Sequence, residues 1–290
     1  MHSIHIAIAS SIGGREEQQD AAHSWTSEHT CLLVLADGVG GNIGGAAAAK
    51  TVIETADEIW NHQHGRFSSP RQSLENIAEL AHQRIAALTP GERRNPASTI
   101  VALYLDEHEA HWIHCGDSRL YRIQNGQTAT RTRDHSVVQL LVEQGKITEE
   151  ELNSHPDKGR ILKSLGGGSF KGSDYQSCTY QPGDQFLLCS DGYWESVPAK
   201  APILPSRPRD RKLEDHINRL VTKAVKQNGP DGDNTTIAIA EVAAPNKSHQ
   251  APAHPQSSPL RSVIKSTLLI IFYTFIVIDI IILFYIFLSQ

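Results

Sequence analysis

The sequence lacks an excess of positive charge. Its 27 Lys and Arg residues face 32 Asp and Glu residues, which gives a formal net charge of −5. A nucleic-acid partner would call for a clustered positive field, so we exclude that class of function. The 290 residues are 39 % apolar, which is enough to bury a core of ordinary globular size.

Cysteines are also few. Four are present, widely spaced and without a CxxC pair: Cys31, Cys115, Cys178 and Cys189. This pattern indicates neither a disulfide framework nor a zinc ribbon, and it fits a reducing compartment best.

The N-terminus has no basic segment before a long apolar stretch, so we expect no signal peptide. A long apolar run occurs near the other end, where Thr267–Leu288 contains one ionisable residue, Asp279. A helix of this length spans about 33 Å, and a bilayer core is about 30 Å thick. Arg261 and Lys265 precede the run, which places the N-terminal part in the cytoplasm. We therefore predict a single-pass, tail-anchored protein of the inner (cytoplasmic) membrane.

Composition divides the chain into three parts. We expect one domain over residues 1–242, because candidate motifs are spread along its whole length and no internal repeat is visible. Residues 243–262 are rich in Pro, Ser, His, Gln and Ala, which predicts a flexible linker. Residues 263–288 form the predicted transmembrane helix.

Apolar runs of strand length are grouped between longer helical patterns. Strands are expected over Cys31–Ala36, Ile100–Leu105, His111–Cys115, Leu120–Ile123, Gln185–Cys189 and Thr236–Val242. Helices are expected over Ala46–Asn61, Pro70–Leu88, Val137–Gln144 and Leu213–Gln227. Ser69 and Ser136 stand at N-cap positions. The grouping favours an α+β layered domain over an alternating parallel sheet.

Aspartates accompany several of these strands. Asp37 and Asp191 end apolar strands and precede glycines, Asp233 comes just before the last strand, and Asp20 lies in an early loop. One such residue alone is more often a structural cap, but four in one domain favour a shared site. Carboxylates suit Mg²⁺ or Mn²⁺, and like charges gathered in one cleft need cations. Asp117, before Ser118 and Arg119, by itself indicates an Asx-turn with an arginine on the rim.

The motifs follow one another in a specific order. They are Arg15…Gln19-Asp20, Asp37-Gly38-Val39-Gly40-Gly41, Ala97-Ser98-Thr99, Gly116-Asp117-Ser118-Arg119, Asp134-His135-Ser136, Leu165-Gly166, Pro182-Gly183-Asp184, Ser190-Asp191-Gly192 and Asp233-Asn234-Thr235-Thr236. From about Ile4 to Val242, this order and spacing resemble the metal-dependent protein phosphatases of the protein phosphatase 2C type.

The resemblance implies a four-layer α-β-β-α sandwich of two antiparallel sheets flanked by helices, with a binuclear metal centre at one end. By this resemblance, Asp37 bridges two Mn²⁺ or Mg²⁺ ions and Gly38 lends its carbonyl to one of them. Asp20 acts at the first metal, directly or through water. Asp191 and Asp233 complete the second.

In bacterial members of the family a third, looser ion is held by residues that correspond to Asp117 and Asp191. The implied activity is hydrolysis of phosphoserine or phosphothreonine by a metal-bridging hydroxide, without a covalent intermediate. Arg15 resembles the arginine that binds the phosphate, since its planar fork can hold two oxygens.

Two departures from the family pattern matter. Gln18-Gln19 stands where members commonly have Asn-Glu or Asn-Gln, which puts the geometry of that loop in doubt but not Asp20. Val39 replaces the histidine proposed as general acid in eukaryotic members, so water or another side chain must protonate the leaving oxygen. His135 is expected in a structural turn. The missing histidine and the flap described next favour a bacterial source.

Residues 139–173 correspond to the flap beside the active site of bacterial members. This segment carries basic residues and a glycine run, which suit docking of a phosphorylated segment: Lys146, Lys158, Arg160, Lys163 and Gly166-Gly167-Gly168. A solvated surface insert is the alternative interpretation.

Two classes of function follow. The first is an active phosphatase that acts on a Ser/Thr kinase or its targets, or that resets an anti-sigma-factor antagonist. The second is a catalytically weak, membrane-tethered binding module, a pseudophosphatase, which requires loss of a metal ligand. The aspartates and Arg15 are present, which favours activity. Asp279, in mid-span, either contacts a partner helix or is tolerated as a neutral residue.

Overall fold

A computed structural model of the protein describes residues 3–39, 44–88, 96–167, 170–198, 201–208 and 211–243. They belong to one compact unit, Met1–Pro245. The linker after Ala243, the predicted span 263–288 and Asp279 lie outside the described residues. Within the described ranges, no helix is both long and apolar enough to cross a membrane.

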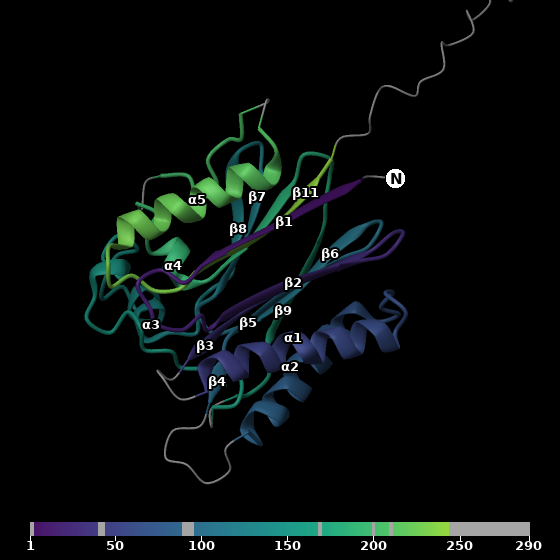
Figure 1. The fold of residues 1–290 in the computed structure, drawn as a ribbon, viewed down its shortest axis with the longest axis horizontal. Helices are drawn as coiled ribbons and strands as arrows, with labels where there is room; N and C mark the ends of the chain where they lie inside the picture. The colour runs from purple at the N-terminus through teal and green to yellow at the C-terminus, as the bar shows by residue number, and fades with distance from the viewer. Residues whose placement is uncertain are drawn as a thin grey trace, which may run out of the picture. The chain divides into compact units, whose positions relative to one another are not determined.

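Two antiparallel sheets form the centre of this unit (Figure 1). The first has the order β1 (Ile4–Ser11), β11 (Thr235–Val242), β10 (Gln185–Cys189), β7 (Arg119–Gln124) and β8 (Gln127–Arg131). The second has the order β2 (Asp20–Thr26), β3 (Cys31–Val39), β5 (Ile100–Leu105), β6 (Glu109–Cys115) and β9 (Asp174–Thr179), and the short β4 (Ala97–Ser98) pairs with β3.

Alternate residues of the central strands pack on two different layers. In β3, Leu33 and Leu35 pack between the sheets, against residues such as Leu188 of β10. Leu32 and Val34 face outward, into the cluster formed with the helices. Successive side chains of a strand point to opposite faces, so a strand covered on both faces is a continuous apolar run.

Helices cover the outer face of each sheet (Figure 1). The second sheet packs against α1 (Gly45–His62) and α2 (Pro70–Ala86). The first packs against α5 (Leu213–Asn228) and the short α4 (Asp191–Trp194), while α3 (Val137–Glu143) and a 3₁₀ turn, Leu152–Ser154, lie between β8 and β9 in the chain. The expected sandwich of two antiparallel sheets flanked by helices is confirmed.

The elements missed by the sequence interpretation are mainly edge strands. The predicted strands Ile100–Leu105 and Gln185–Cys189 match β5 and β10 residue for residue. The strands β1, β2, β8 and β9 stand at the ends of the two sheet orders. An edge strand is partly exposed, as β9 shows with mostly half-buried or exposed residues, and it therefore has no continuous apolar run.

The predicted helices are all present, with small shifts at their ends. Ser136 caps α3 through its hydroxyl, which accepts the Gln139 N–H at 3.3 Å. Ser69 precedes Pro70 at the start of α2 as expected, but its side chain makes no capping hydrogen bond, so that detail was wrong.

Candidate active site

The register of β2 and β3 brings the first two aspartates together. Asp20 opens β2 and lies directly opposite Asp37, near the end of β3. Directly opposed residues of antiparallel strands have Cβ atoms about 4.5–5.5 Å apart on one face of the sheet. Ser190, at the end of β10, donates a hydrogen bond of 2.8 Å to Asp20 Oδ2 and so fixes one oxygen of that carboxylate.

The other three aspartates reach the same end of the sandwich from separate elements. Asp191 is the first residue of α4, immediately after β10, and Asp233 precedes β11, the neighbour of β10. Asp117 lies in the tight connection between β6 and β7. Five aspartates that are far apart in the chain therefore meet because their strands end at one pole.

Electrostatics places Asp37 at the centre of this group. Removal from water raises its pKa well above the usual range, and the charges of Asp20, Asp191, Asp117 and Asp233 each raise it further. A carboxylate whose pKa is raised by the charges of four others has the position expected of a bridging ligand, although this role stays a prediction.

The surrounding carboxyl groups are shifted in the same direction. Burial raises the pKa of Asp20 to about 6, against the lowering effect of hydrogen bonds from Thr236 and Ser190. Burial, followed by the charge of Asp134, raises the pKa of Asp117 to about 7. Burial also raises the pKa of Asp191. Without cations, this arrangement penalises the ionised forms.

Several carboxylate oxygens of the group have no protein partner. Among the described residues, Oδ1 of Asp20, of Asp117 and of Asp191 is buried and accepts no hydrogen bond. Buried polar atoms are normally satisfied, so orphaned acceptors that gather in one place indicate a missing partner. Hard oxygen donors fit Mg²⁺ or Mn²⁺, and the residues present therefore fit the predicted metal centre.

Four of the five aspartates, Asp37, Asp117, Asp191 and Asp233, line a cleft with a volume of about 540 Å³. Its floor includes Asp37 and Gly38, and Val39 also contributes to the lining. Arg15 lies on the wall, where its Nη2 donates to Asp233 Oδ2 at 2.8 Å; both side chains keep about half of their exposure, 55 % and 42 %. Arg15, which we predict to bind the phosphate, is therefore held by Asp233, which we predict to bind a metal ion. Gly40 and Gly41 lie outside the described residues.

Asn234 holds the loop that carries Arg15, a role that the sequence interpretation missed. Its side-chain amide donates to the carbonyls of Ile12, at 2.8 Å, and Glu17, at 3.1 Å, and its Oδ1 accepts the Gln19 N–H at 2.7 Å. The Asp-Asn-Thr-Thr motif was the available signal. Gln18, the departure noted above, accepts the Asp20 N–H at 3.0 Å and so stabilises the same loop.

Two hydroxyl groups connect Asp37 with the Asp117 turn. Thr99 Oγ1 accepts the Asp37 N–H at 3.0 Å and is hydrogen-bonded to the Ser118 hydroxyl at 2.7 Å. The Thr99 N–H also donates to the Asp37 carbonyl at 2.8 Å. The Ala-Ser-Thr and Gly-Asp-Ser-Arg motifs are therefore neighbours in space and position two carboxylates together.

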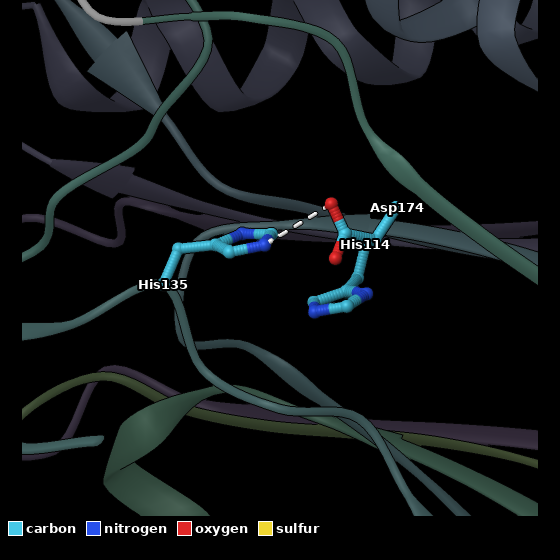
Figure 2. A group of neighbouring side chains, drawn as sticks. All are labelled: His114, His135 and Asp174. Carbon is cyan, nitrogen blue, oxygen red and sulfur yellow. Dashed lines mark ion pairs between the residues drawn. The ribbon is translucent and has the colours of Figure 1, made fainter. Parts of the chain in front are cut away.

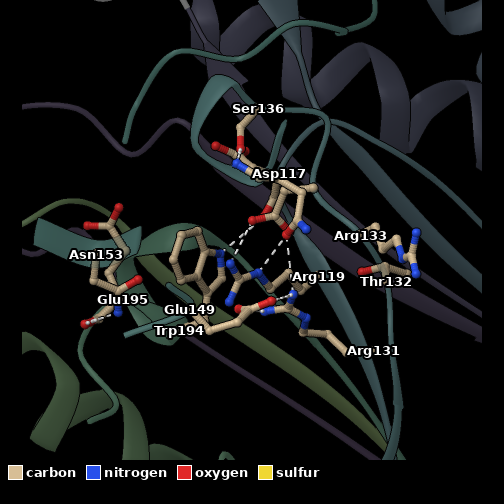
Figure 3. A network of polar contacts seen from close by, with 12 residues as sticks. Asp117, Arg119, Arg131, Thr132, Arg133, Ser136, Glu149, Asn153, Trp194 and Glu195 are labelled. Carbon is tan, nitrogen blue, oxygen red and sulfur yellow. Dashed lines mark hydrogen bonds and ion pairs between the residues drawn. The ribbon is translucent and has the colours of Figure 1, made fainter. Parts of the chain in front are cut away.

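Arg119 is buried, so its expected place on the rim was wrong. It forms two hydrogen bonds with Asp134, at 2.8 and 2.6 Å, and lies 3.5 Å from the ring centroid of Trp194 (Figure 3). The Trp194 indole N–H donates to the Asp117 carbonyl at 3.0 Å. Arg119 therefore supports the Asp117 turn from behind rather than facing the cleft.

His114, His135 and Asp174 form a separate cluster behind this turn (Figure 2). One potential ligand atom from each lies within 4.8 Å of the others. The two rings are stacked with an interplanar angle of 5°, so their in-plane lone pairs do not converge on one point. His135 Nδ1 accepts the Gly116 N–H at 3.1 Å, which leaves the proton on Nε2 beside Asp174. The cluster braces the turn, and His135 is structural as expected.

Most basic residues of the flap are engaged by carboxylates. Lys158 pairs with Glu195 at 2.5 Å, Arg160 with Asp157 at 3.1 Å, and Lys163 with Asp174 at 2.9 Å. The flap reaches the cleft through two uncharged residues, Gly159 and Ile161, and Gly168 lies outside the described residues. This pairing weighs against the expectation that flap cations receive a phosphorylated segment.

Comparisons with known proteins agree with this geometry. The family model of protein phosphatase 2C matches residues 9–229. A putative protein phosphatase 2C-type protein of Streptococcus pyogenes is 34 % identical over 238 residues, which cover 81 % of this chain and 96 % of that protein. The serine/threonine protein phosphatase PstP of Mycobacterium tuberculosis is 30 % identical over 213 residues, 73 % of this chain.

The chain spans only 40 % of the length of that curated PstP relative. A crystal structure of the catalytic domain of a phosphatase PstP, in complex with two manganese ions, superimposes with a TM-score of 0.71 at 26 % identity. That match covers 84 % of this chain and 100 % of the other.

Proposed function

The chain belongs to the protein phosphatase 2C family, and from this premise we propose that it is a metal-dependent protein serine/threonine phosphatase of the bacterial type. The observation that carries the proposal is the convergence of five aspartates at one pole, four of which line one cleft with Arg15, with three buried carboxylate oxygens that accept no hydrogen bond from the described residues. Similar proteins are named for the same activity, and a catalytic domain of PstP holds two manganese ions.

The aspartates have the composition of a site for two Mn²⁺ or Mg²⁺ ions. Asp37 would be shared by both ions, Asp20 would act at one of them and Asp191 with Asp233 at the other, and Asp117 would support a looser third ion. When bound, such ions activate a water molecule for in-line attack on phosphorus and neutralise the phosphate oxygens. Gly38 offers its backbone carbonyl from the cleft floor.

The protein groups around the metal centre orient the substrate. Arg15 binds phosphate oxygens with its planar fork, and Asp233 holds the guanidinium over the cleft while the site is free. Val39 has no proton to give, so the leaving serine or threonine oxygen takes its proton from water or from another side chain.

A metal-dependence assay tests the proposal. The full-length protein should hydrolyse a phosphothreonine peptide with Mn²⁺ or Mg²⁺ and should lose activity in chelator. Full activity in chelator would contradict the metal mechanism. Absence of activity with either ion would favour the alternative, a catalytically weak binding module.

We further propose that residues 263–288 tether the catalytic domain to the inner membrane, with the domain in the cytoplasm and residues 243–262 as the linker. The support is the apolar run and the basic residues before it. The substrates are then phosphorylated proteins within reach of the membrane, such as a Ser/Thr kinase or its targets. Asp279 is a candidate contact for a partner helix.

A further inference from the structure

The cleft has a wall whose charge the proposed chemistry does not use. Arg15, Glu16 and Glu17 follow one another along this wall and line the cleft. Glu16 forms no ion pair with any described residue, and Glu17 Oε2 accepts only a hydrogen bond of 2.9 Å from the neutral Gln19 amide. Both glutamates are exposed to solvent.

Every other charged group of the cleft has a partner or a proposed ligand. The five aspartates face the metal positions, and Arg15 faces Asp233 and the phosphate. Glu16 and Glu17 form no ion pair with a described cation, so they place negative charge at the mouth of the cleft, and bound phosphate adds to it.

The flap does not offset this charge. Its residues in the lining of the cleft are Gly159 and Ile161, and the cations next to them, Lys158 and Arg160, are paired with Glu195 and Asp157. A phosphorylated segment in the cleft thus meets two carboxylates and no unpaired cation from these flap residues.

The backbone that carries the two carboxylates is also held in place. The Asn234 side chain donates to the carbonyls of Ile12 and Glu17 and accepts the Gln19 N–H, so it clamps both ends of the segment that carries them. A fixed charge beside a binding cleft selects partners of opposite sign and repels those of like sign.

We propose that Glu16 and Glu17 select phosphorylated segments that carry Lys or Arg beside the phosphorylated residue. This proposal rests on the phosphatase function proposed above and names its substrate class. The phosphate occupies the metal centre, and the basic flanking residue pairs with the carboxylates at the rim. Both groups are exposed, so the preference is moderate and weakens as salt screens it.

The test compares two phosphothreonine peptides that differ only in flanking Lys or flanking Glu residues. With full-length protein and Mn²⁺ at low ionic strength, kcat/KM should favour the Lys peptide about tenfold, and about twofold in 0.5 M salt. The Glu16→Gln/Glu17→Gln variant should reduce the low-salt ratio to about two, and Glu16→Lys/Glu17→Lys should invert it. A ratio between two substrates is independent of any overall loss of active protein.

The matched control is Glu28→Gln/Glu107→Gln, at the strand turns of the opposite pole, which should keep the wild-type ratio. A wild-type ratio near one, or a ratio unchanged in the Glu16/Glu17 variants, would overturn the proposal. If neither peptide is hydrolysed, the phosphatase function fails instead. In that case, fluorescence polarisation measures the binding of both peptides in the same samples. The difference in their affinities then decides the charge preference without any hydrolysis.

Discussion

The five aspartates of the cleft are chemically identical, but their surroundings differ. Asp37 is influenced by the charges of all four others, whereas the largest charge effect on Asp117 comes from Asp134, which is paired with Arg119. In the proposed centre, Asp37 contacts both ions and Asp117 contacts neither of them. Loss of the Asp37 carboxylate should therefore affect activity more than loss of the Asp117 carboxylate.

Substitution by asparagine tests this difference, because it removes the charge and keeps the volume. Asp37→Asn and Asp233→Asn should lower kcat/KM at least about 100-fold at any Mn²⁺ concentration. Asp117→Asn should instead raise the Mn²⁺ concentration needed for half-maximal activity. Steady-state kinetics over a Mn²⁺ titration distinguishes the two results, and equal, mild losses in all three variants would mean that the centre is misplaced.

Arg15 is expected to contribute to phosphate binding rather than to stability. Its pair with Asp233 is half exposed, and such pairs are worth about 0–1 kcal/mol. Arg15→Lys keeps the charge but loses the two-oxygen contact, so KM should rise several-fold with the melting temperature unchanged. Arg71→Lys, which alters an exposed pair on α2, is the control and should change neither quantity. An unaltered KM in Arg15→Lys would contradict phosphate binding by Arg15 and would leave it as a solvated loop residue.

The raised pKa values of Asp20 and Asp117 predict how pH affects the protein without metal. Their folded pKa values, about 6 and about 7, exceed the ordinary value of 3.8, so the folded state binds more protons than the unfolded state between about pH 4 and 7. Stability in chelator should therefore fall as pH rises through this window.

Mn²⁺ should reverse that trend, since it binds the ionised carboxylates and competes with protons. The increase in melting temperature on adding Mn²⁺ should be larger at pH 7.5 than at pH 5. Differential scanning fluorimetry at both pH values measures it. Asp184, which is buried and paired with Arg122 far from the cleft, provides a control through Asp184→Asn, whose Mn²⁺ response should match wild type. An equal shift at both pH values would contradict the coupling.

At the scale of secondary structure, the short helix α4 is tightly constrained by its neighbours. A Cβ atom at Gly192 would lie 2.1 Å from the carbonyl oxygen of Asn234, and that neighbour is backbone that cannot rotate away. The same α4 begins with Asp191 and ends with Trp194, which supports the Asp117 turn. Close packing at Gly192 thus sets the distance between α4 and the start of β11.

Gly192→Ala should cost about 1–3 kcal/mol of unfolding free energy, because it overpacks this contact. It should also lower activity, since it moves Asp191 relative to Asp233. Gly159→Ala is the matched control, because a Cβ there meets no atom within 4 Å and its φ is ordinary, so stability should be unchanged. Urea denaturation measures both variants, and equal stability in the two would show that α4 yields without strain.

At the scale of the whole domain, the cleft and the exit of the chain lie at opposite poles. Asp233 precedes β11 at the cleft, and the other end of β11 pairs Val242 with Ile4, after which the Ala243 N–H donates to the Ser3 carbonyl. An eight-residue strand is about 27 Å long. A tether at Ala243 would thus leave the cleft accessible on the far side of the domain.

Cell fractionation tests the tether. The full-length protein should be recovered with membranes, and truncation after Arg261 should release it with unchanged kcat/KM for a phosphothreonine peptide. Asp279→Leu should keep it in the membrane fraction and remove crosslinks to any partner helix. Recovery of the truncated form with membranes would contradict the role of residues 263–288.

The sequence by itself determined the α+β layered class, through apolar periodicity, and the motif order that carries the resemblance to the family and names the candidate aspartates. Both are local properties that can be read along the chain. Only the tertiary structure decided which groups are partners. It placed Asp20 opposite Asp37, buried Arg119 behind the Asp117 turn and made Asn234 a clamp for the Arg15 loop. It also paired Lys158 and Arg160 of the flap with carboxylates, while Glu16 and Glu17 form no ion pair at the mouth of the described cleft. The contacts of Arg119 with Asp134 and of Asn234 with Gln19 join residues 15 and 215 positions apart, and strand neighbourhood, which local patterns do not encode, brings them together.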